Sequence, residues 1–337
     1  EEKTRLLKDK SKLWKYGYDR EIDTVIISKD GTLGEIYNFD GLKVGLPQKP
    51  ADKDIINFGI TARNQKWQRE ELPKGLNEDT QDNQEYEDYL YEQFRRRSEG
   101  VWIYLNGKPV YMPGTYWFGI QWVREQIDYP NLRIIQNELM IFWEACKADY
   151  RSFGMQYVKN RRMGASFLGV VELLEAGTIN EDKILGMISK KGDDSRKIFN
   201  RLIKGFKRLP CFFQPLWDGT NTPKKELILD VPTKRRAKNE IVRNDGLGST
   251  ISWHNTEINA MDGDAIFRSM LDECFASGTK ILMEDMTFKN IEDIKVGEYV
   301  IVEGGKKVRV AKTTKGFTEL YKIEQKYSND YVVTENH

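Results

Sequence analysis

Residues 157–166 combine a glycine and a hydroxyl with three basic side chains. Phosphate-binding loops follow the pattern G-x-x-x-x-G-K-[ST]. In that pattern small residues let backbone N–H groups face the phosphates at a helix N-terminus, a lysine neutralises charge and a hydroxyl holds Mg²⁺. Gly164 and Ser166 fit the pattern. Lys159 stands where the first glycine is expected, and Ala165 occupies the usual position of the lysine.

The missing lysine has three candidate replacements at the start of the loop. Lys159, Arg161 and Arg162 could each bring a positive charge to a phosphate. A basic turn that caps an ordinary helix explains the same residues, and for the loop taken alone this structural interpretation is the better one. A second motif downstream is therefore needed to favour a phosphate-binding loop over a basic helix cap.

Residues 266–273 place two acids after a largely apolar run. In a Walker B arrangement, a strand delivers an aspartate to Mg²⁺ and a following glutamate to the water that attacks the γ-phosphate. Asp272 and Glu273 match these positions, although Arg268 and Ser269 are polar where such a strand is usually apolar. Together with the loop, this motif favours a nucleotide site over an edge strand that ends in two solvated acids.

A different chemistry begins at Cys274. A thiol can attack the preceding carbonyl, here that of Glu273, while an imidazole and a hydroxyl strain the peptide bond and protonate its leaving nitrogen. Thr334 and His337 supply these two groups at T-x-x-H spacing. We predict that Cys274, Thr334 and His337 act together in an N-to-S acyl shift. The structural alternative is a buried cysteine and a terminal histidine in an unrelated β-domain.

The elements that must position these residues change in type along the chain. Before residue 135 the patterns predict a strand at 24–28, a helix at 85–97 and a hairpin of 101–105 and 110–112 around Asn106-Gly107. From 136 to 273 they predict helices at 137–148, 165–176 and around 198–206, and strands at 155–158, 184–188, 226–231, 250–253 and 266–271. Such alternation predicts parallel strand pairs with a ligand site at their C-terminal ends. Short strands at 281–283, 299–302, 308–311, 319–323 and 331–334 indicate a small all-β unit.

Composition limits the classes of protein that fit. Lys+Arg total 53 against 52 Asp+Glu, and the net charge of +1 excludes a uniformly basic nucleic-acid coat. The basic run 234–238 could touch DNA phosphates, although a solvated loop is the more common use of a single charge run. No apolar run approaches the ~20 residues that a bilayer crossing needs, so we expect a soluble protein without membrane contacts.

The 3 cysteines form no C-x-x-C pair and the chain has 2 histidines, which argues against a disulfide scaffold or a classical zinc site and fits a reducing compartment. The sequence begins without an initiator methionine and ends at His337 within an apolar-polar alternation. We therefore expect a fragment of a longer reading frame.

Five segments in order resemble the large terminase subunit of tailed phages, in particular that of crAss-like phages. They are residues 100–109, 157–166, 189–197, 209–213 and 272–273. The resemblance implies a motor that uses ATP and Mg²⁺ to drive double-stranded DNA into a procapsid. It further implies a homo-oligomeric ring, a portal protein and a small terminase subunit as partners, and the host cytoplasm as location.

The resemblance also implies roles for individual residues. Arg161 or Arg162 would bind the ATP phosphates in a loop completed by Lys159, Gly164 and Ala165. The Mg²⁺ ligands would be Ser166 and Asp272, and Glu273 would activate water. Ala165 keeps open a second interpretation, a P-loop-like DNA-binding or structural protein that does not hydrolyse ATP.

Residues 274–283 and 291–300 resemble the N-terminal block of an intein, and residues 334–337 resemble its second block. The implied fold class is an α/β P-loop NTPase core of the ASCE type with a β-rich N-terminal region, followed by a partial all-β Hint domain. The expected domains are 1–135, 136–273 and 274–337. An insert after Glu273 splits the ATPase at its carboxylates, so we expect this fragment to be a poor ATPase that does not splice alone. An autoprocessing Hint domain attached to a secreted protein is a third interpretation.

Overall fold

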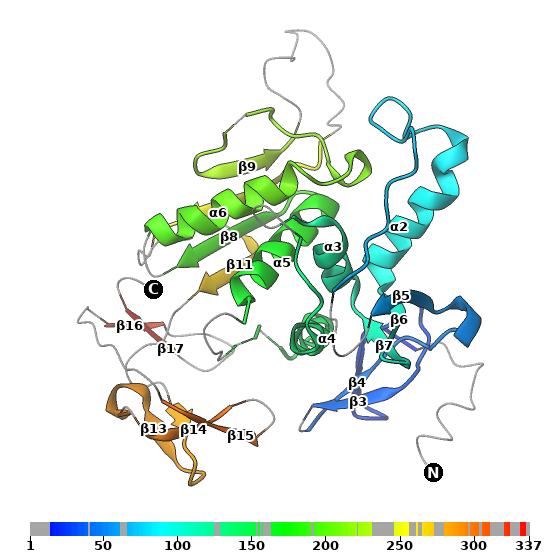
Figure 1. Cartoon of the computed structure of the whole chain (residues 1–337). Coiled ribbons are helices and arrows are strands. Elements are labelled where there is room, and N and C mark those ends of the chain that lie inside the picture. The colour runs from blue at the N-terminus through cyan, green and yellow to red at the C-terminus, as the bar shows by residue number, and fades with distance from the viewer. Residues whose placement is uncertain are drawn as a thin grey trace. The chain divides into compact units, whose positions relative to one another are not determined.

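A computed structural model covers the whole chain (Figure 1). It describes residues 14–39, 41–60, 66–124, 129–152, 154, 155, 157, 163–189, 192–220, 222–230, 246–255, 261, 265–272, 280–295, 297–302, 305–310, 320–323 and 331–334. The chain divides into two compact units, Glu1–Tyr157 with Lys204–Gln214 and Val158–Ile203 with Pro215–His337. The expected domain boundaries after residues 135 and 273 stay predictions.

The described residues of the first unit form two sheets. One has the order β1-β2-β4-β3, built from β1 (Gly17–Asp19), β2 (Thr24–Ile26), β3 (Ile36–Phe39) and β4 (Leu42–Gly45). The other joins β5 (Ile56–Ile60), β6 (Val101–Leu105) and β7 (Lys108–Met112). Val25 and Val44 of the first sheet share a buried cluster with Trp102 of the second. The apolar faces of the two sheets therefore form one core.

The β6–β7 hairpin confirms the turn predicted at Asn106-Gly107. Both residues have positive φ, 53° for Asn106 and 72° for Gly107, as a type I′ turn requires. The antiparallel register pairs Leu105 with Lys108. The second strand therefore begins directly after the turn, two residues earlier than expected.

Helices complete the first unit. They are α2 (Glu87–Glu99), α3 (Gly114–Trp122) and α4 (Ile134–Ala148), with short 3₁₀ turns η1 (Asp52–Asp54), η2 (Gln84–Tyr86) and η3 (Cys211–Phe213). Every residue of α3 is buried, including the polar Thr115 and Gln121, so the helix shows no amphipathic stripe. Gly114 is required at its start, because a Cβ there would lie 2.6 Å from the backbone carbon of Arg97.

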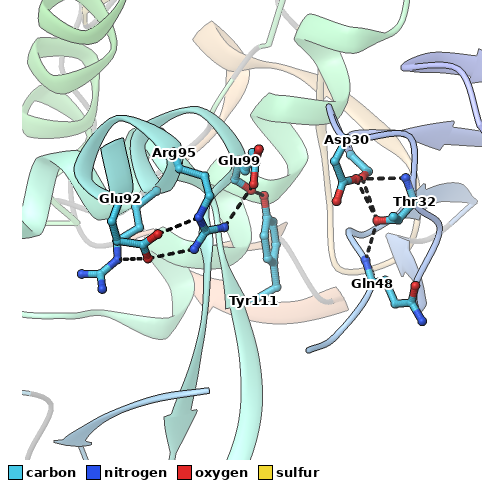
Figure 2. Close-up of polar contacts among 9 residues, drawn as sticks. Asp30, Thr32, Gln48, Glu92, Arg95, Glu99 and Tyr111 are labelled. Carbon is cyan, nitrogen blue, oxygen red and sulfur yellow. Dashed lines mark hydrogen bonds and ion pairs between the residues drawn. The ribbon is translucent and has the colours of Figure 1, made fainter. Parts of the chain in front are cut away.

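Acidic partners neutralise the basic end of α2. Figure 2 shows Arg95 between Glu92 and Glu99, with N···O distances of 2.7 and 3.1 Å. The Tyr111 hydroxyl donates a 2.7 Å hydrogen bond to the backbone carbonyl of Glu99 and so ties β7 to the end of the helix. These contacts account for Arg95 structurally, without a nucleic-acid partner.

A turn in the same unit shows a second polar network in Figure 2. Asp30 accepts hydrogen bonds from the backbone N–H of Thr32 at 2.9 Å and from its hydroxyl at 2.8 Å. The Thr32 hydroxyl also accepts a bond from the backbone N–H of Gln48 at 3.1 Å. Burial by itself would raise the pKa of Asp30, but bonds from Ser28 and Thr32 lower it overall.

The second unit is built on a four-stranded sheet of order β11-β8-β10-β9. Its elements are α5 (Ala165–Ile179), β8 (Ile184–Ser189), α6 (Gly192–Phe206, in this unit as far as Ile203), β9 (Glu226–Leu229), β10 (Ser249–His254) and β11 (Ile266–Asp272). β8 runs parallel to both β10 and β11, which confirms the predicted parallel pairs. α5 packs against β11, β10 and β8 (Figure 1).

One predicted strand of this region is wrong where it can be checked. Met155 and Tyr157 have no strand pairing, while Gln156 and Val158 lie outside the described residues. A short apolar run predicts burial, and burial alone does not supply a partner strand.

The segment after residue 279 folds as small antiparallel pairs. β12 (Lys280–Leu282) pairs with β13 (Phe288–Asn290), β14 (Tyr299–Val302) with β15 (Lys306–Arg309) and β16 (Leu320–Ile323) with β17 (Tyr331–Thr334). The turn η5 (Ile291–Asp293) follows β13, and a bridge between Met283 and Val300 links the first two pairs. The predicted all-β character is confirmed, with β13 as an additional strand. No helix among the described residues is long and apolar enough to cross a membrane.

Candidate functional site

The site begins where the basic loop enters α5. Gly164 precedes the helix with φ 78° and ψ 20°, a left-handed conformation that glycine adopts without the steric cost of a Cβ. Its carbonyl accepts the first helical bonds, from the backbone N–H of Phe167 at 3.0 Å and of Leu168 at 3.2 Å. Ala165 and Ser166 are therefore the first two helical residues, where N–H groups lack partners within the helix and favour anions.

Ser166 meets the acid of the second motif. Its hydroxyl donates a 2.9 Å hydrogen bond to Oδ2 of Asp272, the last residue of β11. Asp272 is also in register with Ser189, the last residue of β8. Two residues separated by more than a hundred positions thus meet at the carboxyl ends of parallel strands, the edge where ligand sites form in such sheets.

A third parallel strand ends at the same edge. β10 finishes at His254, whose Nε2 lies 2.8 Å from the hydroxyl of Ser252. The next residue, Asn255, approaches the start of α6 so closely that a Cβ on Gly192 would lie 3.2 Å from its Cγ. Small residues at this edge therefore let the loop after β10 and the N-terminus of α6 come together.

The start of α6 is fastened to the end of β8. The Ser195 hydroxyl is fully buried and accepts a 2.8 Å hydrogen bond from the backbone N–H of Ser189. Asp193 and Asp194 occupy the first turn of the helix, where negative side chains are favoured by the helix dipole. A capping aspartate would precede the first helical residue. Both aspartates instead lie inside the helix, which begins at Gly192.

The donor set at Ser166 and Asp272 fits a magnesium ion. Mg²⁺ prefers oxygen ligands, keeps several waters and is often held by one or two protein oxygens together with phosphate oxygens. A hydroxyl and a carboxylate at a helix N-terminus match that requirement. Within the part of the chain that the structure describes, no group of three or more His, Cys, Asp or Glu could hold a metal alone. Such an ion would therefore need a phosphate ligand or water to complete its shell.

Four of the predicted site residues lie at one edge of the sheet, and most of the others lie outside the described residues. The structure brings Gly164, Ala165, Ser166 and Asp272 together at one edge of the sheet. Thr334 ends β17 opposite Leu320, and its side chain is not described. The predicted residues that lie outside the described part of the chain are Lys159, Arg161, Arg162, Glu273, Cys274 and His337.

Sequence reasoning missed two contacts that support this edge. The Nε of Arg268 on β11 lies 3.5 Å from Oε1 of Glu172 on α5. The Glu172 side chain is buried and the Arg268 side chain is partly buried. A Cβ on Gly169 would lie 2.8 Å from Cε of Met270. The available signal was a pair of glutamates, Glu172 and Glu175, within the largely apolar helix 165–179, together with an arginine in a strand that should have been apolar.

In the segment after residue 279, one glutamate organises the turn before β14. Glu298 accepts a bond from Lys289 Nζ at 2.7 Å and another from the backbone N–H of Lys295 at 2.9 Å. The bond from Lys289 is the main cause that lowers the pKa of the Glu298 carboxyl. Met283 and Ile294 of this segment are buried.

Comparison with known proteins identifies this segment. Residues 274–337 match the Hom_end-associated Hint family, the domain type of inteins. The chain therefore carries a Hint domain that begins at Cys274, and with it a capacity for protein splicing chemistry. No curated protein matches the chain.

Proposed function

We propose that the sheet and helices before Cys274 belong to a nucleotide-hydrolysing motor of the terminase type, and that the Hint domain is an intein inserted into it. One observation carries the nucleotide part: Ser166 and Asp272, selected by two separate motifs, are joined by a 2.9 Å hydrogen bond at the carboxyl edge of parallel strands. The Hint match begins two residues after Asp272, which supports an insertion at the catalytic carboxylates.

In this proposal the chain's own residues prepare a phosphate site. Mg²⁺·ATP supplies the γ-phosphoryl group that water attacks. Ser166 and Asp272 hold the metal, and the N–H groups at the start of α5 bind phosphate oxygens. Lys159, Arg161 and Arg162 are the cations of the loop, and Glu273 orients and deprotonates water.

The Hint domain performs a separate reaction on the chain itself. The Sγ of Cys274 attacks the carbonyl carbon of Glu273, a C–S bond forms and the C–N bond between the two residues breaks. The thiol proton ends on the freed amine of Cys274, so the step needs no co-reactant. Thr334 and His337 strain the peptide bond and protonate the leaving nitrogen.

We propose that ATP hydrolysis becomes efficient only after the Hint domain has been removed. Glu273 is the proposed water-activating residue and also the acyl donor of splicing, so the unspliced chain carries the Hint domain directly after its catalytic acid. We expect an unspliced precursor to hydrolyse ATP slowly. Double-stranded DNA, a portal protein and a small terminase subunit are the partners that we propose for the spliced motor, as a homo-oligomeric ring.

Nucleotide binding is tested by thermal unfolding with ATP and Mg²⁺. The 337-residue chain should unfold at a higher temperature in their presence, because a ligand that binds only the folded state stabilises it. Asp272→Ala should lose this shift, whereas the control Asp79→Ala, at an exposed position in the first unit, should keep it. No shift in the unmodified chain would favour the non-hydrolysing DNA-binding alternative, in which Ala165 marks a lost lysine.

Splicing is tested on the full product of the gene. Mass spectrometry should find a ligated host chain without the Hint domain, and Cys274→Ala should abolish it while Cys211→Ala leaves it unchanged. Ligated host from the Cys274→Ala variant would refute the assigned nucleophile. A second measurement compares the Mg²⁺-ATPase rate of the Cys274→Ala precursor with that of a chain lacking the insert. Equal rates would contradict the proposal that the Hint domain slows ATP hydrolysis in the unspliced chain.

The Hint match also fits an autoprocessing protein whose Hint domain cleaves itself from a secreted partner. The same mass spectra distinguish the two candidates. Autoprocessing releases the chain upstream of Cys274 without joining it to a second host segment, whereas an intein yields the ligated product.

A further inference from the structure

Three side chains of β11 meet three residues of α5 in a regular series. Arg268 pairs with Glu172, Met270 packs over Gly169, and Asp272 accepts the bond from Ser166. Along the strand these residues are two apart, so they share one face. Along the helix they are three apart, which also places them on one side.

The first pair of this series is held from several directions. Arg268 donates a 3.1 Å bond to the backbone carbonyl of Phe267, and its guanidinium lies 4.4 Å from the centre of the Phe267 ring. Its partner Glu172 is 8 % exposed within an apolar helix. Buried charges are retained where they are paired, and the loss of one partner leaves the other charge uncompensated. The pair therefore resists any sliding of β11 along α5.

The middle contact leaves no room for sliding. At Gly169 the helix backbone comes so close to Met270 that a Cβ would lie 2.8 Å from Cε and 2.9 Å from Cγ. A shift of β11 by one residue would turn Arg268 and Asp272 to the opposite face of the sheet. Ser166 would then lose the carboxylate, and the two metal-ligand candidates would separate.

We infer that Glu172 and Arg268 are positioning residues, which set the register of β11 on α5 and thereby hold Asp272 against Ser166. The inference rests on the proposed function for the identity of the ligand at Ser166 and Asp272, whereas the register itself rests on the three contacts. Neither residue touches the phosphates or the metal. They act through the strand that carries Asp272.

The experiment uses the 337-residue chain and two measurements. Hydrogen exchange of the β11 amides reports the register, and calorimetric titration with Mg²⁺·ADP reports the site. Glu172→Gln should speed exchange at β11 and weaken Mg²⁺·ADP binding by about tenfold, the lower range for outer-shell partners of metal ligands. The control Glu284→Gln removes the same charge from an exposed pair, with Lys307 at 2.7 Å, and should change neither measurement.

A second set of variants separates positioning from general destabilisation. Arg268→Gln should reproduce both effects of Glu172→Gln, and Arg268→Lys should restore most of the affinity because a cation again faces Glu172. Unchanged affinity and unchanged β11 exchange in folded Glu172→Gln and Arg268→Gln would overturn the inference. If the unmodified chain does not bind Mg²⁺·ADP, the proposed function fails, and exchange at β11 alone then decides whether the pair sets the register.

Discussion

Replacing Gly169 by alanine has opposite expected effects in two backgrounds. The new Cβ would lie 2.8 Å from Cε and 2.9 Å from Cγ of Met270, with Sδ closer still. Because Cγ is near the root of the side chain, rotating the terminal methyl does not relieve the overlap. Overpacking of this kind costs about 1–3 kcal/mol, whereas glycine to alanine within a helix gains about 1 kcal/mol. We expect Gly169→Ala to destabilise the second unit by about 1 kcal/mol.

The same substitution should stabilise a chain that already carries Met270→Ala. Without the methionine the overlap disappears, and only the helix-propensity gain of about 1 kcal/mol remains. The assay is urea denaturation of the four chains of this double-mutant cycle, with hydrogen exchange of the β11 amides to assign the effect to the contact. An effect of the same sign in both backgrounds would show that Met270 does not limit the approach of α5, and the reasoning would fail.

Three further predictions concern the first unit. Burial by itself would raise the pKa of Glu144, but Lys147 at 2.8 Å lowers it overall, below the ordinary 4.5. The ionised Glu144 carboxylate therefore stabilises the folded state above pH 4.5, and this stabilisation is lost as the pH falls through the lowered pKa of the folded state. Glu144→Gln removes the titrating group, so the melting temperature of the variant should fall less steeply at acid pH. Gly114→Ala would place a Cβ against the Arg97 backbone and should cost about 3 kcal/mol in urea denaturation, and wild-type stability would contradict the close packing. Gly107→Val must adopt φ 72° and should cost about 1–2 kcal/mol, whereas an unchanged midpoint would exclude the type I′ turn.

Short sequence patterns correctly predicted the β6–β7 hairpin and the parallel strand pairs. The hairpin needed only a turn that tolerates positive φ between two apolar runs, and Asn106 and Gly107 supplied it. The parallel pairing of β8 with β10 and β11 followed from alternation of strands and helices. Residues close together in the chain determine these features, so the local sequence pattern is enough to predict them.

Features that depend on a distant partner were missed or wrong. β13 contains a single large apolar residue, Phe288, and becomes a strand only because β12 lies opposite it. Met155 and Tyr157 had strand character in sequence but do not lie in a strand. α3 was not predicted, since a helix buried on all sides has no polar face to reveal its period.

The candidate site divides in the same way. Ser166 and Asp272 were selected by motif, and their meeting followed from the expected parallel sheet. Arg268 and the neighbouring Ser269 counted against the strand, because polar residues interrupt the apolar run that a buried strand is expected to have. Its partner Glu172 lies on another element, and no periodicity links the two positions. A charge on each of two neighbouring apolar elements is the pattern that would have suggested the pair.

The series of contacts between α5 and β11 also explains how a site could survive an insertion beside it. Asp272 is fixed by its register with Ser189 and by the bond from Ser166, so the sheet is held up to two residues before Cys274. In the proposed function, splicing exchanges the bond after Glu273 while β11 keeps its place. A strand free to slip by one residue would present Ser166 with a different side chain after ligation. In this proposal the contacts at Glu172 and Gly169 prevent that slip, so the proposed metal ligands Ser166 and Asp272 need not be rebuilt once the Hint domain has left.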